Sequence, residues 1–272
     1  MEKCEKCGEN VSIVKHCEES FSVEIDENGK EHYFHLRCLL KKEPPNKLYI
    51  GGWDNPSLYP KENMNNIQGA KYWKNRKLDD DYCDWRTNNE NWIKEYWESK
   101  DHSHRKQIIS ILRKLDHWDS LLDIGCNCGT NLRLISEKFK DKKLTGMDIN
   151  KWALNFGRKN LSGVKFIEGN IEKKFPFKDK EFSCSLIDAV LMYIDDKNIE
   201  TVISEINRVT KKVIILCEWY DINKLGVLNG GHYARNYSIL LSDFGWKVKT
   251  RKIIWPTSKK WETFGKLFIA IK

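Results

Sequence analysis

The chain has 272 residues, 32% of them charged and 40% hydrophobic, and its formal net charge is +8 at pH 7. This length can build one or two domains with a full core, and the composition is typical of a globular protein. No run of about 18 apolar residues is present, which argues against a membrane-spanning helix, and the N-terminus lacks the apolar stretch of a signal peptide. We therefore expect a cytoplasmic protein without a membrane partner, whose nine cysteines are thiols or metal ligands and not disulfides.

Three regions differ in composition along the chain. Residues 1–42 contain a cluster of cysteine and histidine residues, and residues 43–90 are rich in Pro, Gly, Asn and aromatic residues. The aromatic side chains of this connecting segment are too apolar to remain in solvent, so we expect it to pack on the next domain. Residues 91–272 alternate strand-like and helix-like segments and form the predicted main domain.

Two residue pairs in the first region have the spacing of metal-binding turns. In each pair two residues separate the ligands, which are Cys4 and Cys7, then His35 and Cys38. Because so short a region lacks a core of its own, we predict that these four residues bind one structural Zn²⁺. The ligand spacing, and only the spacing, resembles that of the zinc fingers of the LIM and poly(ADP-ribose) polymerase types.

The segment between the two pairs indicates a β-hairpin over residues 20–35, which turns near Asn28 and Gly29. Three further residues could replace one of the four ligands: His16, Cys17 and His32.

The periodicity of the main domain predicts strands and helices in alternation. Strands are expected at 120–125, 143–149, 163–170, from 182, and at 211–219, 246–254 and 264–272. Helices are expected at 104–115, 131–139, 150–160, 195–209 and 237–245. Strands separated by helices indicate a parallel sheet that is covered on both faces. The last two strands have no predicted helix between them, so we expect the final strand to be antiparallel.

The turn after the strand at 120–125 is the first candidate site. Gly125 and Gly129 allow the left-handed dihedrals and the close backbone approach that a ligand-binding turn requires. Asn127 is the next best residue type for a left-handed conformation. Thr130 or Asn131 is expected to cap the helix that follows.

Acidic residues around this turn argue against a dinucleotide. Asp123 precedes Gly125 by two residues, where it would repel a pyrophosphate, and the G-x-G-x-x-G spacing is absent. A carboxylate there suits a ligand with an amino group, while Asp148, at the end of the next strand, can accept hydrogen bonds from both ribose hydroxyls. Cys126 and Cys128 are closer in sequence than the cysteines of metal-binding turns, so we interpret them as lining of the loop.

At these residues the main domain resembles the class I S-adenosylmethionine-dependent methyltransferases. The matching segments, in family order and spacing, are LLDIGCNCG, LTGMDIN, VKFIEGNIE, FSCSLIDAVLMYI and KKVIILCEW. The segment IKEYWESKDHSHRKQII also resembles helices that precede the first strand in one bacterial and archaeal branch. The resemblance implies a Rossmann-like α/β fold, whose seven-stranded, mostly parallel sheet has the order 3-2-1-4-5-7-6, an antiparallel seventh strand and helices on both faces.

The resemblance also implies a cofactor site. The loop that would hold the methionine part of S-adenosylmethionine comprises Asp123, Gly125, Cys126, Asn127 and Gly129. Asp148 would hold the ribose, Ile149 would pack on the adenine, Asn170 and Ile171 would border the adenine ring, and Asp188 and Ala189 would lie near the methyl group. Tyr96 and Arg105 would close over the cofactor, with Arg105 facing its carboxylate.

Methyl transfer depends mainly on holding donor and acceptor in line, and a base is needed only for some acceptors. We expect the acceptor near the loops after the fourth and fifth strands, where the candidate catalytic residues are His232, Tyr193 and Glu218. His232 is the candidate base, and Arg235 is the candidate for binding an anionic group. The predicted function is therefore methyl transfer to a small-molecule acceptor. The basic C-terminal region suggests that this acceptor is anionic.

Two alternatives remain open from the sequence. The first is an RNA or protein methyltransferase whose zinc finger reads the substrate, although the acidic first region disfavours nucleic-acid binding by the finger. The second is a catalytically silent adaptor that contains zinc. The oligomeric state has no signal in the sequence.

Overall fold

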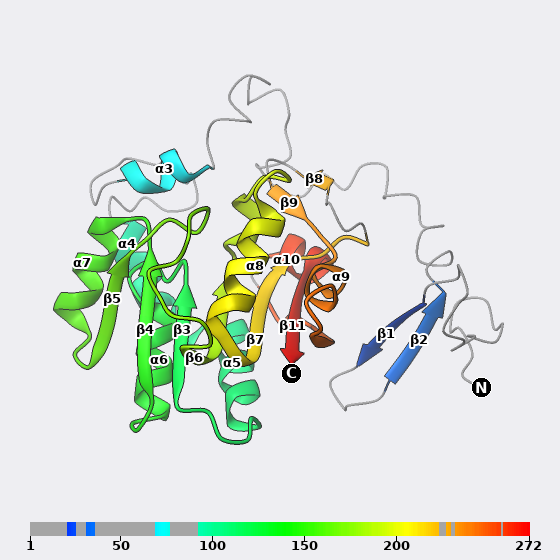
Figure 1. Cartoon of the computed structure of the whole chain (residues 1–272), viewed down its shortest axis with the longest axis horizontal. Helices are drawn as coiled ribbons and strands as arrows, with labels where there is room; N and C mark the ends of the chain where they lie inside the picture. Colours follow the sequence, from blue (N-terminus) through cyan, green and yellow to red (C-terminus); the bar gives the residue numbers. More distant parts are fainter. Residues whose placement is uncertain are drawn as a thin grey trace.

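The computed structural model describes residues 21–25, 31–35, 69–76, 92–222, 227–229, 232–256 and 258–272. The centre of the molecule is a seven-stranded sheet with helices on both faces (Figure 1). In sheet order the strands are β10 (Lys247–Lys252), β11 (Gly265–Ile271), β7 (Thr210–Trp219), β6 (Phe182–Asp188), β3 (Ser120–Ile124), β4 (Lys143–Asp148) and β5 (Val164–Glu168).

The strand directions follow the predicted pattern. The neighbouring pairs from β5 through β4, β3 and β6 to β7 are all parallel. Strand β11 runs antiparallel to both β7 and β10. With β3 counted as the first strand of the main domain, this order is 3-2-1-4-5-7-6, and the prediction of an antiparallel last strand is confirmed.

The helices of the main domain connect these strands. They are α4 (Trp92–Glu98), α5 (Ser103–Arg113), α6 (Thr130–Lys138), α7 (Lys151–Asn160), α8 (Ile199–Val209), α9 (Tyr237–Ser242) and α10 (Lys259–Phe264), with 3₁₀ turns η1 (Ser99–Asp101) and η2 (Leu191–Tyr193). Upstream, α3 (Ala70–Asn75) lies above one end of the sheet (Figure 1). Sequence periodicity did not predict α3, α10 or the hairpin of β8 (Val227–Asn229) and β9 (His232–Ala234).

The core has two layers, one on each side of the sheet. In β3, Leu121 packs into the layer beneath α5 and α6, whereas Leu122 and Ile124 pack into the layer beneath α8 and α9. Strand residues that alternate between two buried faces must be apolar at every position. The continuous apolar runs of these strands therefore reflect a sheet that is covered on both sides.

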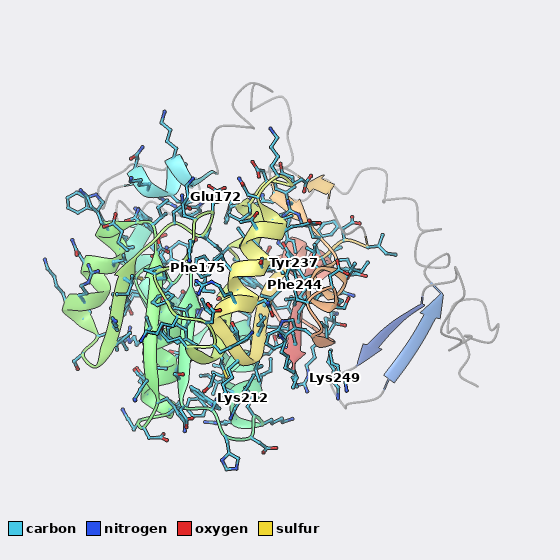
Figure 2. All side chains as sticks on the ribbon, viewed as in Figure 1. Glu172, Phe175, Lys212, Tyr237, Phe244 and Lys249 are labelled. Carbon is cyan, nitrogen blue, oxygen red and sulfur yellow. The ribbon has the colours of Figure 1, made fainter. Side chains whose placement is uncertain are left out.

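Helix α8 shows how the spacing of apolar residues fixes one of these layers. Ile199, Val202, Ile203 and Ile206 recur every three or four residues and are fully buried. Phe175 and Tyr237 pack into the same layer, while Lys249 is exposed at the lower edge of the sheet (Figure 2). Burying a side chain of the size of isoleucine contributes about 1.5–3 kcal/mol, so this helix is a large part of one core.

The zinc module cannot be placed, because three of its four predicted ligands, Cys4, Cys7 and Cys38, lie outside the described residues. The fourth, His35, is the last residue of β2 (Glu31–His35), which pairs antiparallel with β1 (Phe21–Ile25). This pairing confirms the predicted hairpin, and β1 lies next to β10. The predicted boundaries of the three regions stay a prediction.

Of the connecting segment at 43–90, the structure describes residues 69–76, and these pack on the main domain through Trp73 and Asn150. Within the described ranges, no helix is long and apolar enough to cross a membrane. A cytoplasmic location goes beyond this finding and stays a prediction.

Candidate functional site

The turn after β3 has the strained backbone that its sequence predicted. Gly125, Asn127 and Gly129 have φ angles of 74°, 53° and 85°. A Cβ on Gly125 would lie 2.4 Å from a methyl group of Val190, so this position needs glycine for space as well as for conformation. The Asn127 side chain supports its own left-handed conformation by accepting a hydrogen bond from the Cys128 amide at 2.7 Å.

The two cysteines of this turn are free buried thiols. Cys126 lies against Gly146, and Cys128 contacts the carbonyl of Ile93 and the Thr130 hydroxyl. Burial raises the pKa of Cys126 well above its usual range and that of Cys128 to about 11. Both thiols are therefore neutral packing groups, as the sequence interpretation held.

The prediction that Thr130 or Asn131 caps the next helix, α6, is wrong. Gly129 occupies the N-cap of α6 without a side-chain bond. The hydroxyl of Thr130 instead donates to the carbonyl of Tyr96 at 2.8 Å, which attaches α4 to the turn. The Asn131 amide is used by Asp188. Capping was predicted from residue type alone, whereas tertiary partners decide where these polar groups bond.

Asp148 and Asn150 form a node beside the turn. The two oxygens of Asp148 accept hydrogen bonds from the backbone N–H groups of Asn127 at 2.7 Å and of Asn150 at 2.8 Å. The Asn150 side-chain oxygen caps α7 by accepting hydrogen bonds from the amides of Trp152 and Ala153. Its amide nitrogen donates to backbone carbonyls of the segment 69–76. One residue thus joins the turn, a helix start and the upstream segment.

A cavity opens at the carboxyl ends of β3, β4 and β6, between this turn and α3 and α4. It is lined by most of the predicted cofactor residues, namely Tyr96, Arg105, Gly125, Cys126, Asn127, Asp148, Ile149, Asn170, Ile171, Asp188 and Ala189. Asp123 and Gly129 lie behind its wall. In open parallel sheets, ligands bind outside the carboxyl ends of the strands, at the point where the strand order reverses.

Asp123 is a buried carboxylate in need of a partner. It is 1% exposed, and neither of its oxygens accepts a hydrogen bond within the described residues. Burial, with the nearby negative charge of Asp188, raises its pKa well above its usual range. Such a group calls for a cation or a hydrogen-bond donor.

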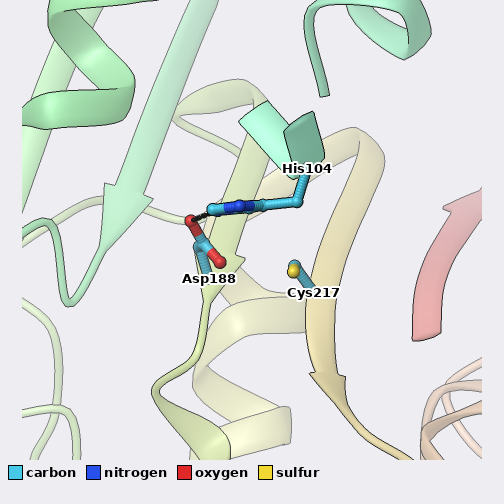
Figure 3. Close-up of side chains that lie close together, drawn as sticks. All are labelled: His104, Asp188 and Cys217. Atoms are coloured by element: carbon cyan, nitrogen blue, oxygen red, sulfur yellow. Dashed lines mark hydrogen bonds and ion pairs between the residues drawn. The ribbon is translucent and has the colours of Figure 1, made fainter. Parts of the chain in front are cut away.

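Asp188, at the end of β6, is paired instead. Its Oδ2 atom lies 3.0 Å from His104 Nε2 (Figure 3). The same oxygen lies 3.0 Å from an Arg105 guanidinium nitrogen and 3.0 Å from the Asn131 amide nitrogen. The interactions with His104, Arg105 and Asn131 outweigh burial and hold the pKa of this carboxyl well below its usual range. The Arg105 guanidinium therefore pairs with Asp188, and its predicted contact with the carboxylate of the cofactor stays a prediction.

The same cluster contains the residue types of a metal site. His104, Asp188 and Cys217 place their potential ligand atoms within 4.8 Å of one another, and within the described residues no other such group exists (Figure 3). The Arg105 guanidinium already balances the charge of Asp188 and would repel a divalent cation. Burial raises the pKa of the Cys217 thiol well above its usual range, so a thiolate is disfavoured. We interpret the cluster as a hydrogen-bonded network.

A second histidine extends this network toward the surface. The Nδ1 atoms of His102 and His104 are 2.6 Å apart, so one of them donates to the other, and the Trp255 ring stacks on His104 at 4.2 Å. Sequence reasoning missed both histidines. The signal was present in the run His102, His104 and Arg105, three basic side chains within four residues ahead of an apolar helical pattern.

Glu218, a predicted catalytic residue, lies beneath the loop that follows β6. Its carboxylate accepts hydrogen bonds from the backbone N–H groups of Val190, Leu191 and Met192 at 2.7, 2.8 and 3.2 Å. Burial raises the pKa of Glu218 to about 8, although these three donors act in the opposite direction. The geometry favours an anchoring role for the loop over contact with an acceptor.

The other predicted catalytic residues take different positions. Tyr193 lines the cavity, and His232 lies behind it, with its ring 5.1 Å from that of Tyr193 and 4.8 Å from that of Trp219. Arg235 is fully buried, with its guanidinium on Asp196 at 2.7 Å and on two backbone carbonyls. The expectation that Arg235 binds an anionic group of the acceptor is therefore wrong, because its guanidinium is buried and already bound to groups of the protein.

The sequence of the sheet's central part matches a known family. Residues 121–213 match the family model described as a methyltransferase domain. The release factor glutamine methyltransferase of Fusobacterium nucleatum is 28% identical over 152 residues, which are 52% of this chain and 41% of that protein. The fatty-acid O-methyltransferase of Mycolicibacterium smegmatis is 32% identical over 68 residues, 24% of each chain, and a trans-aconitate 2-methyltransferase of Acidovorax is 27% identical over 82 residues, 29% of this chain and 32% of that protein. The chain thus spans less than half the length of these relatives.

Solved structures share the fold. A chain from the complex between the Haloferax volcanii Trm112 methyltransferase activator and a methyltransferase superposes with a TM-score of 0.53 at 16% identity, over 66% of this chain and 95% of that chain. A protein described as an O-methyltransferase from Nostoc punctiforme superposes with a TM-score of 0.53 at 13% identity, over 66% and 60%. The comparisons thus show a match to a methyltransferase domain over residues 121–213 and a fold that solved methyltransferase structures share.

Replacing Asp188 by Asn should destabilise the protein. The change leaves the Arg105 guanidinium buried without an ionised partner, and breaking a buried pair in this way costs about 3 kcal/mol of unfolding free energy. Urea denaturation at pH 7 measures the loss. The control is Asp179→Asn, which breaks an exposed pair with Arg208 and should cost less than about 1 kcal/mol. Equal losses for the two variants would contradict the role of the network.

His102 should make stability depend on pH. Burial, with the charges of His104 and Arg105, lowers the pKa of His102 from 6.5 to about 4. Between those values the unfolded chain binds more protons than the folded chain, so stability falls as pH falls from 6.5 to 4. His102→Asn removes this contribution and keeps every other titrating group. Denaturation midpoints at pH 6.5, 5 and 4 should therefore fall less steeply in the variant, and parallel slopes would refute the assignment.

Proposed function

We propose that this chain transfers the methyl group of S-adenosylmethionine to a small-molecule acceptor. The observation that carries the proposal is the Asp148 carboxylate, held by two backbone N–H groups beside a left-handed glycine turn at the edge of the cavity. A carboxylate at the end of the second parallel strand is placed to accept hydrogen bonds from ribose hydroxyls. Ile149, Asn170 and Ile171 lie along the same wall, where we place the adenine.

The residues present also fit the methionine part of the cofactor. Asp123 has two buried oxygens without a partner, next to the turn that lines the cavity. The ammonium group of S-adenosylmethionine is a cation with three donors, which is the partner that such a carboxylate needs. Only glycine fits at position 125 of this turn, because a side chain there would collide with Val190.

S-adenosylmethionine supplies a methyl group bound to a cationic sulfur, which makes that carbon an electrophile. The task of the protein is to align the acceptor with it and to exclude water. Glu218 fixes the loop 190–192 through three hydrogen bonds, and this loop holds Tyr193 in the cavity wall. We propose Tyr193 as an acceptor-contacting residue, with His232 supporting its ring from behind.

Two features support a small acceptor. The fatty-acid and trans-aconitate relatives are named for small molecules. The residues after β6 read Asp188-Ala-Val-Leu-Met-Tyr193, without the Asn-Pro-Pro-Tyr type of segment that accompanies methylation of base amines and of glutamine amides.

We further propose a structural zinc ion in the first region, held by Cys4, Cys7, His35 and Cys38. The support is the spacing of the two pairs, each with two intervening residues, and the β-hairpin that ends at His35. The ion would stabilise a region too short to build its own core, and the cytoplasm is the compartment in which free thiols remain available to it.

The chain should bind S-adenosylmethionine with one site per chain in titration calorimetry. Asp148→Asn should weaken this binding by about tenfold or more, because a hydrogen bond to a charged group contributes about 1.5–3 kcal/mol. Asp141→Asn, an exposed carboxylate far from the cavity lining, is the control and should bind as the wild type does. An absence of binding at millimolar ligand would refute the proposal and favour the adaptor alternative.

Purified protein should contain one zinc per chain by mass spectrometry of metals. Cys4→Ser should lose it, because a serine hydroxyl is a poor ligand for Zn²⁺ compared with a thiolate. Cys83→Ser removes a cysteine outside the four predicted ligands and should keep the metal. Undiminished zinc in Cys4→Ser protein would show that the ion, if bound, has other ligands.

A further inference from the structure

One part of the cavity lining is aromatic. Four rings line it, Trp73 from α3, Trp92 and Tyr96 from α4, and Tyr193 from η2. They form a continuous series, because the Trp73 ring lies 5.2 Å from that of Tyr193 and 6.5 Å from that of Trp92, which lies 6.0 Å from that of Tyr96. Segments distant in the sequence thus supply one apolar wall.

The wall is held in place by the cofactor side of the cavity. The Asn150 amide nitrogen donates to the backbone carbonyl of Trp73 at 2.7 Å and to that of Arg76 at 2.6 Å. Asn150 is 2% exposed, and its own N–H bonds Asp148. The Arg76 guanidinium lies 4.2 Å from the centre of the Trp92 ring. The Trp73 ring is therefore pre-positioned, which reduces the entropic cost of binding against it.

The described lining of this wall offers an anion no available cation. The charged lining residues are Arg105, Asp148 and Asp188, and the buried Arg76 guanidinium lies against the Trp92 ring, so two cations stand against two acids. Arg105 donates to Asp188, to Asn131 and to Ser99 through both its hydroxyl and its backbone carbonyl. The guanidinium of Arg105 is therefore already occupied, and a carboxylate would meet the Asp148 carboxylate and four rings whose faces are electron-rich.

We propose that the methyl acceptor is a flat ring compound that is neutral or cationic, bound against Trp73, Tyr193 and Trp92, and that carboxylates are rejected. This inference rests on the proposed function and replaces the anionic acceptor that the basic C-terminal region suggested. Rings stack on such walls at low cost, and an ammonium group gains from the aromatic faces and from the acidic lining. Asn150 is a positioning residue for the wall.

Matched probes test the proposal on protein saturated with S-adenosylhomocysteine. Tryptamine and indole-3-propionate share one ring and differ in charge, and phenethylamine and 3-phenylpropionate repeat the comparison with a smaller ring. Calorimetry should give each amine an affinity about tenfold or more above that of its carboxylate partner. A carboxylate that binds as tightly as its amine, or the absence of binding by all four probes, would overturn the proposal.

Variants locate the binding to the wall. Trp73→Leu should lower the affinity for tryptamine by about tenfold, whereas Trp73→Phe keeps a flat ring and should retain most of it. Asn150→Ser keeps a capping oxygen for α7 but loses the donors to the segment 69–76, and should reproduce the Trp73→Leu loss. Equal amine affinity in Trp73→Leu and wild-type protein would place the binding elsewhere and refute the wall.

Binding of S-adenosylhomocysteine by the same samples separates the two proposals. If the wild type binds this ligand but shows no preference for amines, the acceptor class is wrong and the methyltransferase function stands. If the wild type fails to bind it at millimolar concentration, the proposed function fails, and the acceptor assignment falls with it.

Discussion

The buried carboxylate of Asp188 is the interaction on which the site depends. One oxygen atom of this carboxylate, at the end of β6, contacts His104 and Arg105 from α5 and Asn131 from α6. A buried charge is tolerated only when paired and hydrogen-bonded, so these helices can take few other positions relative to the sheet. The network therefore sets the floor of the cavity. It also commits the Arg105 guanidinium to Asp188, Asn131 and Ser99, and our proposal for the acceptor rests on this commitment.

Asn150 organises the opposite side of the cavity. Asn150 uses its backbone and both side-chain polar atoms, to support Asp148, to begin α7 and to hold the segment 69–76. Because one side chain serves the carboxylate proposed for the ribose and the ring proposed for the acceptor, the two halves of the cavity are built as a unit. Methyl transfer requires such mutual alignment of donor and acceptor. The structure thus gives a physical reason why an upstream segment, remote in the sequence, belongs to the site.

The rest of the site is shaped by loop backbone. Three left-handed residues turn the chain after β3, and Val190 from the loop after β6 fills the space that a side chain at Gly125 would need. Glu218 anchors that second loop from β7 through three amides. A carboxylate predicted to react with an acceptor is in this way a support for Tyr193, which does line the cavity. Position in a loop near the site was therefore a weaker guide than the direction of the side chain.

The sequence by itself determined the fold and the left-handed turn after β3, where we propose that the cofactor binds. Apolar runs interrupted by amphipathic helices specify a sheet buried on both faces, and the left-handed conformation of Asn127 and the cap at Asn150 follow from local residue preferences. Only the tertiary structure decided the partners of Arg105, Glu218 and Arg235, and the approach of His102, His104 and Trp73. Most of those contacts join residues tens of positions apart, and their strength comes from burial, which no local pattern encodes. The acceptor side depends on such contacts, which is why our proposal for the acceptor differs from the anionic one that the sequence suggested.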